Sequence, residues 1–380
     1  MTPEARNREA LDLLEAISAS AQPADAVASA WFRTRRYAGS KDRAAVLDQV
    51  FSSLRHRISL GWREASGTGE GPLPDFAQAE LPPWLFARFQ DSFGTDALAE
   101  AEALIPEAPV DLRVATRRIA VSDVVGILAS SGIPAAPAPW SPVGVRVAGR
   151  FQLPDGLKDG QVEVQDVGSQ VIAALVDAEP GHRVLDRCAG GGGKTLAIAD
   201  RTSQAFVLAA DANPARLSPL PARLARAGAT NVSARPAEAN AKWLRRERFD
   251  RVLVDAPCSG IGVLRRHPDT RHRLTADQVD RVCQTQAAIL DEVAPLVSPG
   301  GRLIYATCSV LREENQTQVQ SFLGRHPEFA LVPVAEIWAR VGLLGDPPGL
   351  VPEGLLLSPR RSATDGFFVS ILTRALGAHP

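Results

Sequence analysis

A run of four glycines carries the strongest chemical signal in the sequence. It lies in Asp186-Arg-Cys-Ala-Gly-Gly-Gly-Gly-Lys-Thr195, between an apolar segment and a helical pattern. Glycines let the backbone approach a ligand closely and expose amide groups at the start of a helix, which suits an anionic or carboxylate-bearing cofactor. A nucleotide-triphosphate loop is the alternative, because Gly193-Lys194-Thr195 matches its second half and Asp255 could bind magnesium. That motif needs a glycine where this chain has Cys188, which disfavours the alternative.

An aspartate, Asp211, ends the next apolar segment, 21 residues after Gly190. A carboxylate at this distance from a glycine loop can accept hydrogen bonds from both hydroxyls of a ribose. The pattern suits NAD and S-adenosylmethionine equally, so it predicts a ribose-bearing cofactor without choosing between them. A helix-capping role for Asp211 is the structural alternative.

Two of the four cysteines follow apolar segments in the same way. Cys258 lies in Asp255-Ala-Pro-Cys-Ser-Gly260, and Cys308 lies in Thr307-Cys-Ser309. Taken alone, each would more often be a small buried hydrophobic residue. Beside the glycine loop and Asp211, they indicate a pair of thiols at a cofactor site.

Methylation of a pyrimidine carbon is the chemistry that needs two thiols beside such a cofactor. Carbon 5 of cytosine is too weak a nucleophile to attack a sulfonium methyl group, so a thiolate first adds to carbon 6 and pushes electron density onto carbon 5. A second group then helps to remove the carbon 5 proton, which lets the first thiol leave. An acid nearby can hydrogen-bond the ring nitrogen or the amino group and stabilise the charge that develops there. Asp255 and its neighbours meet these demands.

These residues can meet only if the strands before them end at one edge of a sheet. From about Gly181 the pattern alternates between strands and helices. Strands are predicted over 183–186, 205–211, 232–235, 251–255 and 302–307, and helices from 195, around 222–227 and from 275 to 297. This alternation predicts an α/β fold with a doubly wound, mainly parallel sheet, in which ligands bind at the carboxyl ends of the strands.

The motifs resemble those of the RNA 5-methylcytosine methyltransferases of the NOL1/NOP2/Sun family, and the layout resembles its bacterial RsmB-like ribosomal RNA branch. The resemblance runs in family order over roughly residues 160 to 372. The two cysteine motifs, taken together, are its most specific part, and they lie in the third and fourth of the matching stretches. These stretches are Val164-Gln-Asp-Val-Gly-Ser-Gln170, Asp186-Arg-Cys-Ala-Gly-Gly-Gly-Gly-Lys-Thr195, Asp255-Ala-Pro-Cys-Ser-Gly-Ile-Gly-Val-Leu-Arg-Arg-His-Pro-Asp269, Tyr305-Ala-Thr-Cys-Ser-Val-Leu-Arg-Glu-Glu-Asn315 and Asp365-Gly-Phe-Phe368.

The resemblance implies a role for each site residue. Cys308 would be the nucleophile that adds to cytosine, and Cys258 would be the thiol needed for product release. Asp255 would lie between the cofactor and the target base. Asp211 would bind the ribose of S-adenosylmethionine, and the loop that holds the cofactor would consist of Cys188, Ala189, Gly190, Gly191, Gly192, Gly193 and Lys194.

The chain departs from the family pattern at three places. Gly190-Gly191 stands where the family loop usually carries Ala-Pro, and Pro219 and Pro221 interrupt the helix after Asp211. For the acid that would contact the adenine side of the cofactor, the sequence offers Glu238, which is shifted and one methylene longer than the family residue.

Together with the composition of the chain, the resemblance implies four segments. A helical NusB-like domain over 1–65 and a linker over 66–75 precede a small α+β RNA-binding domain over 76–155, and a Rossmann-like methyltransferase domain follows over 156–380. In the helical domain, Trp31-Phe-Arg-Thr-Arg-Arg-Tyr37 interleaves aromatic rings with cations, which could stack on bases and grip phosphates. A corner between two helices is the alternative reading of that stretch.

Composition limits the class of protein. The 380 residues include 42 Lys+Arg and 43 Asp+Glu, and the four cysteines form no disulfide or zinc pattern. No apolar stretch approaches the roughly 20 residues of a membrane span, and the first residues lack an apolar leader. We therefore expect a cytoplasmic protein without a membrane or a metal partner.

A basic stretch favours a nucleic-acid partner. Residues 242–273 carry nine Lys/Arg against four Asp/Glu, which is typical of a surface that binds phosphates, although a solvated surface can look the same. We expect an S-adenosylmethionine-dependent methyltransferase that binds RNA, with ribosomal RNA favoured over tRNA. A non-catalytic assembly factor with the same fold is the alternative function.

Overall fold

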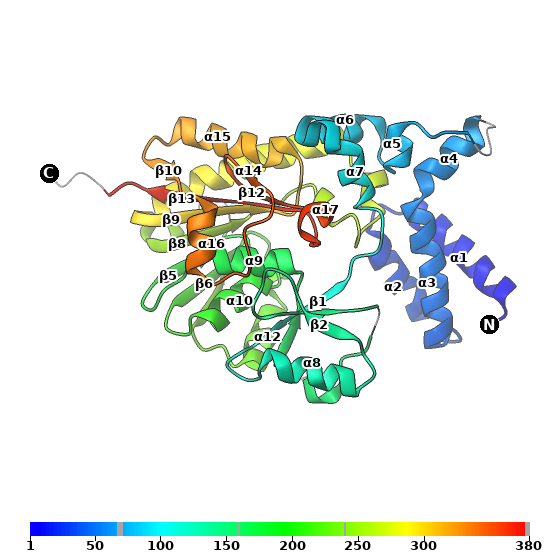
Figure 1. The fold of residues 1–380 in the computed structure, drawn as a ribbon, viewed down its shortest axis with the longest axis horizontal. Helices are drawn as coiled ribbons and strands as arrows, with labels where there is room; N and C mark the ends of the chain where they lie inside the picture. Colours follow the sequence, from blue (N-terminus) through cyan, green and yellow to red (C-terminus); the bar gives the residue numbers. More distant parts are fainter. Residues whose placement is uncertain (67–70, 150, 158–159, 239–240, 377–380) are drawn as a thin grey trace. The chain divides into compact units, whose positions relative to one another are not determined.

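The computed structural model describes the chain except for residues 67–70, 150, 158–159, 239–240 and 377–380 (Figure 1). Its contacts divide the chain into two compact units. One consists of Met1–Ala108 with Gly260–Ala276, and the other of Pro109–Ser259 with Asp277–Pro380. Part of the linker predicted over 66–75 falls outside the described residues. Within the described ranges, no helix combines the length and the apolar character needed to cross a membrane.

The first unit is helical. Thr2 begins α1 by accepting a hydrogen bond from Ala5 N at 3.3 Å. Apolar residues spaced three or four apart within each of the first three helices face a common core: Ala10, Leu13, Ile17, Ala24, Ala28, Phe32, Val46, Val50 and Leu54. Ala38, between α2 and α3, joins the same core. The α-helices of this unit are α1 (Pro3–Ser18), α2 (Ala24–Thr34), α3 (Ser40–Arg55), α4 (Arg57–Ser66), α5 (Asp75–Gln78), α6 (Pro83–Phe93), α7 (Ala97–Glu102) and α13 (Thr270–Arg273).

The stretch of aromatic rings and cations, residues 31–37, forms the corner between α2 and α3. The Arg35 guanidinium lies 3.3 Å from the centroid of the Trp31 ring. Glu9 of α1 accepts hydrogen bonds from the indole N–H of Trp31 at 2.6 Å and from the Tyr37 hydroxyl at 2.8 Å. These contacts tie the corner between α2 and α3 to α1. The Tyr37 side chain is 66% exposed, and a base-stacking role for this stretch stays a prediction.

The segment that follows Cys258 in the sequence belongs to this helical unit. Asp269 accepts a hydrogen bond at 3.0 Å from Ala24 N, at the first residue of α2. Arg271 is 1% exposed. Its guanidinium donates to three backbone carbonyls at or just after helix ends, those of Arg55, Glu80 and Leu104. The basic stretch 242–273 is therefore divided between the two units, and these two members of it hold helices together.

The second unit begins with a four-stranded antiparallel sheet in the order β2–β3–β1–β4. Helix α8 (Val121–Ser130) packs against it through Val124 and Leu128. The edge strand β2 lies in a proline-rich stretch, which fits the edge of a sheet because proline lacks a backbone donor. The strands are β1 (Val110–Val114), β2 (Ala135–Pro137), β3 (Gly144–Val147) and β4 (Val162–Val164).

The larger sheet of this unit has nine strands in the order β11–β12–β13–β9–β8–β5–β6–β7, with β10 paired to β13. The parallel part, β9–β8–β5–β6–β7, contains all five strands predicted from the sequence. These strands are β5 (Arg183–Asp186), β6 (Phe206–Asp211), β7 (Val232–Pro236), β8 (Phe249–Asp255) and β9 (Val297–Thr307). The predicted doubly wound α/β fold is confirmed.

Four antiparallel strands extend the sheet beyond β9 and were not predicted. The longest, β13, pairs with β9 over six residue positions, from Thr307↔Phe368 to Arg302↔Thr373. The strands are β10 (Phe329–Leu331), β11 (Leu350–Val351), β12 (Gly354–Leu357) and β13 (Phe367–Arg374).

Helices cover both faces of the larger sheet. Figure 1 has α14 and α15 on one side of the strands and α9, α10 and α16 on the other. The second group packs on buried strand residues such as Val184, Leu253 and Ile304. The helices of this unit, in addition to α8, are α9 (Val167–Leu175), α10 (Gly193–Arg201), α11 (Pro214–Leu217), α12 (Leu220–Ala227), α14 (Ala276–Val293), α15 (Gln316–Arg325), α16 (Val334–Arg340) and α17 (Pro359–Ser362).

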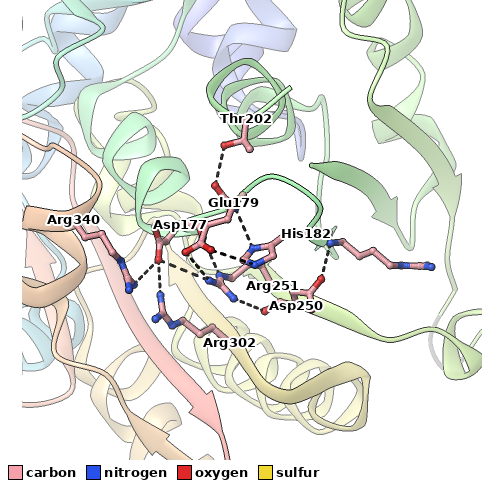
Figure 2. A network of polar contacts seen from close by, with 10 residues as sticks. Asp177, Glu179, His182, Thr202, Asp250, Arg251, Arg302 and Arg340 are labelled. Atoms are coloured by element: carbon pink, nitrogen blue, oxygen red, sulfur yellow. Dashed lines mark hydrogen bonds and ion pairs between the residues drawn. The ribbon is translucent and has the colours of Figure 1, made fainter. Parts of the chain in front are cut away.

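A buried carboxylate gathers three arginines at the amino ends of the parallel strands (Figure 2). Asp177, just before β5, is 7% exposed and has a left-handed backbone with φ of +50°. Its Oδ2 lies 2.7 Å from Arg302 Nη1, 2.5 Å from Arg340 Nη2 and 3.9 Å from Arg251 Nη2. The carboxylate therefore joins β8, β9 and α16.

We expect Asp177→Asn to lower the free energy of unfolding by about 3 kcal/mol, because it leaves partly buried guanidinium groups without their counter-charge. Asparagine tolerates a left-handed backbone, so the change isolates the lost charge. Urea unfolding followed by circular dichroism measures the effect. Glu179→Gln is the matched control, since the Glu179 side chain is 55% exposed and 4.0 Å from Arg251. A loss of equal size in both variants would contradict the prediction.

Candidate active site

The carboxyl ends of four neighbouring parallel strands bring the predicted site residues together. In the order β9–β8–β5–β6, Cys308 follows β9, Asp255 ends β8 shortly before Cys258, the glycine loop follows β5, and Asp211 ends β6. Adjacent parallel strands end at the same edge of a sheet, so these residues form one candidate site there.

The glycine loop uses backbone conformations that glycine adopts readily. Gly190 and Gly192 have φ of +51° and +82°. A Cβ at Gly192 would lie 2.2 Å from Leu220 Cδ1, so Leu220 would have to shift, and the positive φ disfavours any side chain there. Helix α10 begins at Gly193, and its first backbone N–H groups lack helical acceptors. The loop therefore combines close backbone approach with available donors.

Asp211 ties the glycine loop to β6. Its Oδ2 accepts a hydrogen bond from Gly190 N, and its Oδ1 accepts one from Asn213 N, both at 2.9 Å. Each carboxylate oxygen has a further lone pair, so Asp211 can hold the loop and also accept from ribose hydroxyls. The glycine cradle and this buried carboxylate fit the ribose-bearing cofactor that the sequence predicts.

Lys194 reaches from the glycine loop to the end of β8. Its Nζ donates a hydrogen bond to Asp255 Oδ2 at 2.7 Å. Lys194 is buried, whereas 31% of the Asp255 side chain is exposed. Burial alone would lower the pKa of Lys194, but the negative charge of Asp255 and the hydrogen bond to it raise that pKa above its ordinary value. Lys194 therefore stays cationic beside Asp255.

Cys258 and Cys308 lie side by side, with their sulfur atoms 3.1 Å apart, and neither forms a disulfide. The other two cysteines are Cys188 in the glycine loop and Cys283 in α14. Burial raises the pKa of each of these two to about 12. A thiol with so high a pKa is a poor nucleophile near neutral pH, which leaves Cys258 and Cys308 as the candidate nucleophiles.

The remaining sequence-based expectations concern the region after β6 and β7. The helix after Asp211 is split into α11 and α12, as Pro219 and Pro221 predict. Glu238 is exposed, and its neighbour Ala237 donates from its N to the Asp211 carbonyl at 3.0 Å. Residues 239–240 lie outside the described ranges, and a contact between Glu238 and a cofactor stays a prediction.

A buried acid that the sequence did not single out lies beneath the glycine loop. Asp186, at the end of β5, is 1% exposed, and its Oδ2 accepts a hydrogen bond from Thr195 Oγ1 at 2.6 Å. Among the described residues its Oδ1 has no hydrogen-bond partner. Burial raises the pKa of Asp186 to about 7. The sequence does contain a signal for Asp186, because this residue ends its predicted strand as Asp211 and Asp255 end theirs.

We expect Asp186 to make the stability depend on pH. The pKa in the folded protein, about 7, exceeds the ordinary value of 3.8, so the folded state binds this proton more tightly than the unfolded chain does. The contribution to stability is therefore full below about pH 4 and is lost as the pH rises to about 7, with a slope of at most about 1.4 kcal/mol per pH unit. Urea unfolding over this range should show a flatter profile for Asp186→Asn than for the wild type. If stability changes with pH equally steeply in Asp186→Asn and in the wild type, Asp186 is not the source of the pH dependence.

Comparison with protein families decides what this fold belongs to. A model described as "16S rRNA methyltransferase RsmB/F" matches residues 173–373, more than half of the chain. The chain belongs to the RsmB/F family. A second model, described as the ferredoxin-like domain of RsmF/B-like methyltransferases, matches residues 81–153. The first match contains the glycine loop, Asp211, Asp255 and both candidate cysteines.

Curated relatives agree with the RsmB/F assignment. The "Ribosomal RNA small subunit methyltransferase B" of Salmonella agona is 39% identical over 286 residues, which cover 73% of this chain and 66% of the relative. The protein of the same name from Salmonella typhi has the same identity and coverage. The match thus spans about two thirds of the length of these relatives.

Solved structures share the fold of this RsmB/F family member. The crystal structure of PH0851 covers 98% of this chain with a TM-score of 0.82 at 22% identity, and the match covers 99% of that chain. A "Methyltransferase Homolog Protein" from Pyrococcus horikoshii covers 79% of this chain and 97% of its own, with a TM-score of 0.67 and 25% identity. NSun6 from Pyrococcus horikoshii, solved with SFG, covers 77% of this chain and 98% of its own, with a TM-score of 0.65 at 18% identity.

The family models and the contacts divide the region before the catalytic domain differently. The ferredoxin-like model covers α6, α7 and three strands of the four-stranded sheet, β1, β2 and β3. By contacts, α5, α6 and α7 group with the N-terminal helices, and the four-stranded sheet groups with the larger sheet. The domain limits predicted at 65, 75 and 155 therefore stay a prediction.

Proposed function

We propose that this RsmB/F family member is an S-adenosylmethionine-dependent RNA methyltransferase that forms 5-methylcytosine in ribosomal RNA. The observation that carries the proposal is the pair of reduced thiols, Cys258 and Cys308, whose sulfur atoms lie 3.1 Å apart. The Lys194–Asp255 ion pair joins the glycine loop to the strand that precedes Cys258. A reaction in which one thiol adds to a base and a second group helps to remove a proton accounts for this arrangement.

The residues around the glycine loop would hold S-adenosylmethionine. Residues 188–194 would offer backbone amides, Asp211 would accept the ribose hydroxyls, and Glu238 would contact the adenine side. When bound, this cofactor supplies an electrophilic methyl group. Asp211 keeps the loop in place through its hydrogen bond from Gly190 N.

The cysteines and Asp255 would carry out the transfer. The Cys308 thiolate would form a bond to carbon 6 of cytosine and push electron density onto carbon 5, which would accept the methyl group that the cofactor supplies as its sulfur–methyl bond breaks. Asp255, held by Lys194, hydrogen-bonds the ring nitrogen or amino group where charge develops. Cys258 helps to remove the proton from carbon 5, the double bond re-forms, and the Cys308–carbon 6 bond breaks.

The substrate would be a cytosine that leaves its stack. A base within a helix cannot reach a thiol at the edge of a sheet, so a loop or an exposed junction of ribosomal RNA is the expected target. The family description and the names of the curated relatives, which specify 16S or small-subunit ribosomal RNA, support this substrate class. Transfer RNA is the alternative.

The experiment that tests the proposal uses purified protein, tritiated S-adenosylmethionine and total RNA from a strain that lacks the gene. The RNA is separated by size and digested to nucleosides. Label in 5-methylcytidine from small-subunit ribosomal RNA is the expected result. Label in tRNA would change the substrate, and label in another nucleoside would reject the chemistry. Cofactor binding without any transfer, even to immature ribosomal subunits, would favour a non-catalytic assembly factor.

We expect Asp211→Ala to weaken S-adenosylmethionine binding by about 1.5–3 kcal/mol, which is roughly a 10- to 150-fold rise in Kd. The variant loses a charged acceptor and also frees the amide of Gly190 from its partner. Isothermal titration calorimetry measures the affinity. Asp123→Ala, at an exposed position of α8, is the control and should bind as the wild type does. An unchanged Kd for Asp211→Ala would remove Asp211 from the cofactor site.

A further inference from the structure

We propose that Glu314 is a positioning residue that fixes the two cysteine-bearing loops relative to each other. Its carboxylate lies between Ser259, the residue after Cys258, and Ser309, the residue after Cys308. The role in catalysis rests on the proposed function, whereas the contacts do not. Glu314 would act through the two thiols and would not touch the substrate.

The Glu314 carboxylate is fully buried and accepts hydrogen bonds on both oxygens. Oε1 accepts from the hydroxyls of Ser259 and Ser309. Oε2 accepts from Ser259 N at 2.8 Å and from Gln286 Nε2 at 3.0 Å. One side chain therefore binds both cysteine loops and helix α14, which carries Gln286.

A second set of contacts holds the backbone of Glu314 itself. The Tyr305 hydroxyl, from inside β9, donates to the Glu314 carbonyl at 2.6 Å. The next residue, Asn315, accepts from Thr307 Oγ1 at 2.6 Å and donates from Nδ2 to the Ser309 carbonyl at 2.9 Å. Glu314 is therefore anchored to the strand that Cys308 follows, and it reaches from there to the loop of Cys258.

The chemistry of the carboxylate suits this position. An ionised carboxylate only accepts hydrogen bonds and has about four acceptor sites, which match the two N–H and two O–H donors around it. Gln286 Nε2 also donates to the Pro257 carbonyl at 3.0 Å, so the residue before Cys258 is held as well. The sulfur–sulfur distance of 3.1 Å is thus supported by contacts on both sides of Cys258 and directly after Cys308.

Glutamine can replace Glu314 with little loss of these contacts. Its carbonyl oxygen can accept from Ser259 N and Gln286, and its amide can donate to the two serine hydroxyls, because a hydroxyl both donates and accepts. Alanine removes every contact. Comparing Glu314→Gln with Glu314→Ala therefore separates the geometry of the loops from the negative charge.

The first measurement needs neither RNA nor cofactor. Diamide oxidises two neighbouring thiols to a disulfide and takes up their two electrons and two protons, and mass spectrometry of peptides follows the Cys258–Cys308 bond. We expect Glu314→Ala to form this bond about tenfold more slowly than the wild type, because reactions between held groups are sensitive to displacements on the order of 1 Å. Glu314→Gln should react at nearly the wild-type rate. Glu313→Ala, a change at the neighbouring glutamate, is the matched control.

The second measurement is the single-turnover rate of methyl transfer to ribosomal RNA at saturating S-adenosylmethionine. Glu314→Ala should be about 100-fold slower and Glu314→Gln within about tenfold of the wild type, with the cofactor Kd unchanged in both. A wild-type protein that transfers no methyl group would defeat the proposed function, and the oxidation rates would still test the positioning role.

Two results would overturn the proposal. One is oxidation of Glu314→Ala at the wild-type rate, and the other is a Glu314→Gln variant as slow as Glu314→Ala, which would assign the effect to charge. If circular dichroism shows that Glu314→Ala does not fold, the Ser259→Ala/Ser309→Ala double variant replaces it, since it keeps the carboxylate and removes the two hydroxyl contacts to it. Ser309→Ala alone is its control, because it also loses the hydrogen bond from Leu311 N to Ser309 Oγ but leaves the contacts between Glu314 and Ser259 in place. Slower disulfide formation in the double variant supports the role of Glu314, and an unchanged rate rejects it.

Discussion

Alanine in place of Cys258 should leave the protein covalently attached to its RNA. In the proposed reaction Cys308 adds to cytosine and the methyl group is transferred, but the adduct breaks down only after the carbon 5 proton is removed. Without the Cys258 thiol that last step is slow, so the adduct accumulates when cofactor and RNA are both present. A slow band on a denaturing gel that collapses on RNase treatment measures it.

Alanine in place of Cys308 should have the opposite effect, because it prevents the adduct from forming. Cys308→Ala cannot form the bond to carbon 6, so we expect no adduct and a loss of methyl transfer of at least about a thousandfold. Cys283→Ala is the control, because this thiol lies in α14 and burial raises its pKa to about 12. An adduct trapped by Cys308→Ala would reverse the two roles, and a trapped adduct in neither variant would argue against covalent catalysis.

Asparagine in place of Asp255 is expected to slow methyl transfer by about 100- to 1,000-fold at saturating cofactor. The change keeps the shape of the side chain but removes the charge that pairs with Lys194 and replaces the carboxyl group that would hydrogen-bond the base. It should also lower the pKa of buried Lys194, since burial disfavours the ammonium and the charge of Asp255 opposes that effect. Single-turnover assays across a pH series measure both consequences.

Strand β8 offers a matched control for this change. Asp250 lies near the other end of the same strand and accepts a hydrogen bond from Arg183 N at 2.8 Å. Asp250→Asn keeps an acceptor there and should leave methyl transfer unchanged. If Asp255→Asn transfers the methyl group at the wild-type rate, Asp255 has no part in the chemistry, and the Lys194–Asp255 pair is structural.

The N-terminal helices hold a segment that comes directly after Cys258 and Ser259, because the chain passes from the second unit into the helical unit at Gly260. Residues 260–276 pack within the helical unit, where Asp269 binds the start of α2 and Arg271 binds helix-end carbonyls. The helical unit is thus built from two separated parts of the sequence. We infer that removing residues 1–108 would leave the segment after Cys258 without the partners of its buried side chains.

Much of the candidate site could be predicted from the sequence, because it consists of short motifs at strand ends. The glycine loop, Asp211, Asp255 and the two cysteines each follow a strand whose apolar pattern is local. Alternation of strands and helices then places those strand ends at one edge of a parallel sheet. The five parallel strands were predicted for the same reason.

The tertiary structure alone decided the parts that depend on distant partners. Strand β13 is buried along most of its length and reads as a continuous apolar run, which periodicity cannot tell from a buried helix. Glu314 and Ser259 are 55 residues apart, so their hydrogen bond is invisible in the sequence although Glu314 lies within a recognisable motif. Asp269 and Arg271 looked like part of a basic surface, but their partners in the first 104 residues bury them. Local patterns determine which element forms, and only packing determines which charged side chains are enclosed.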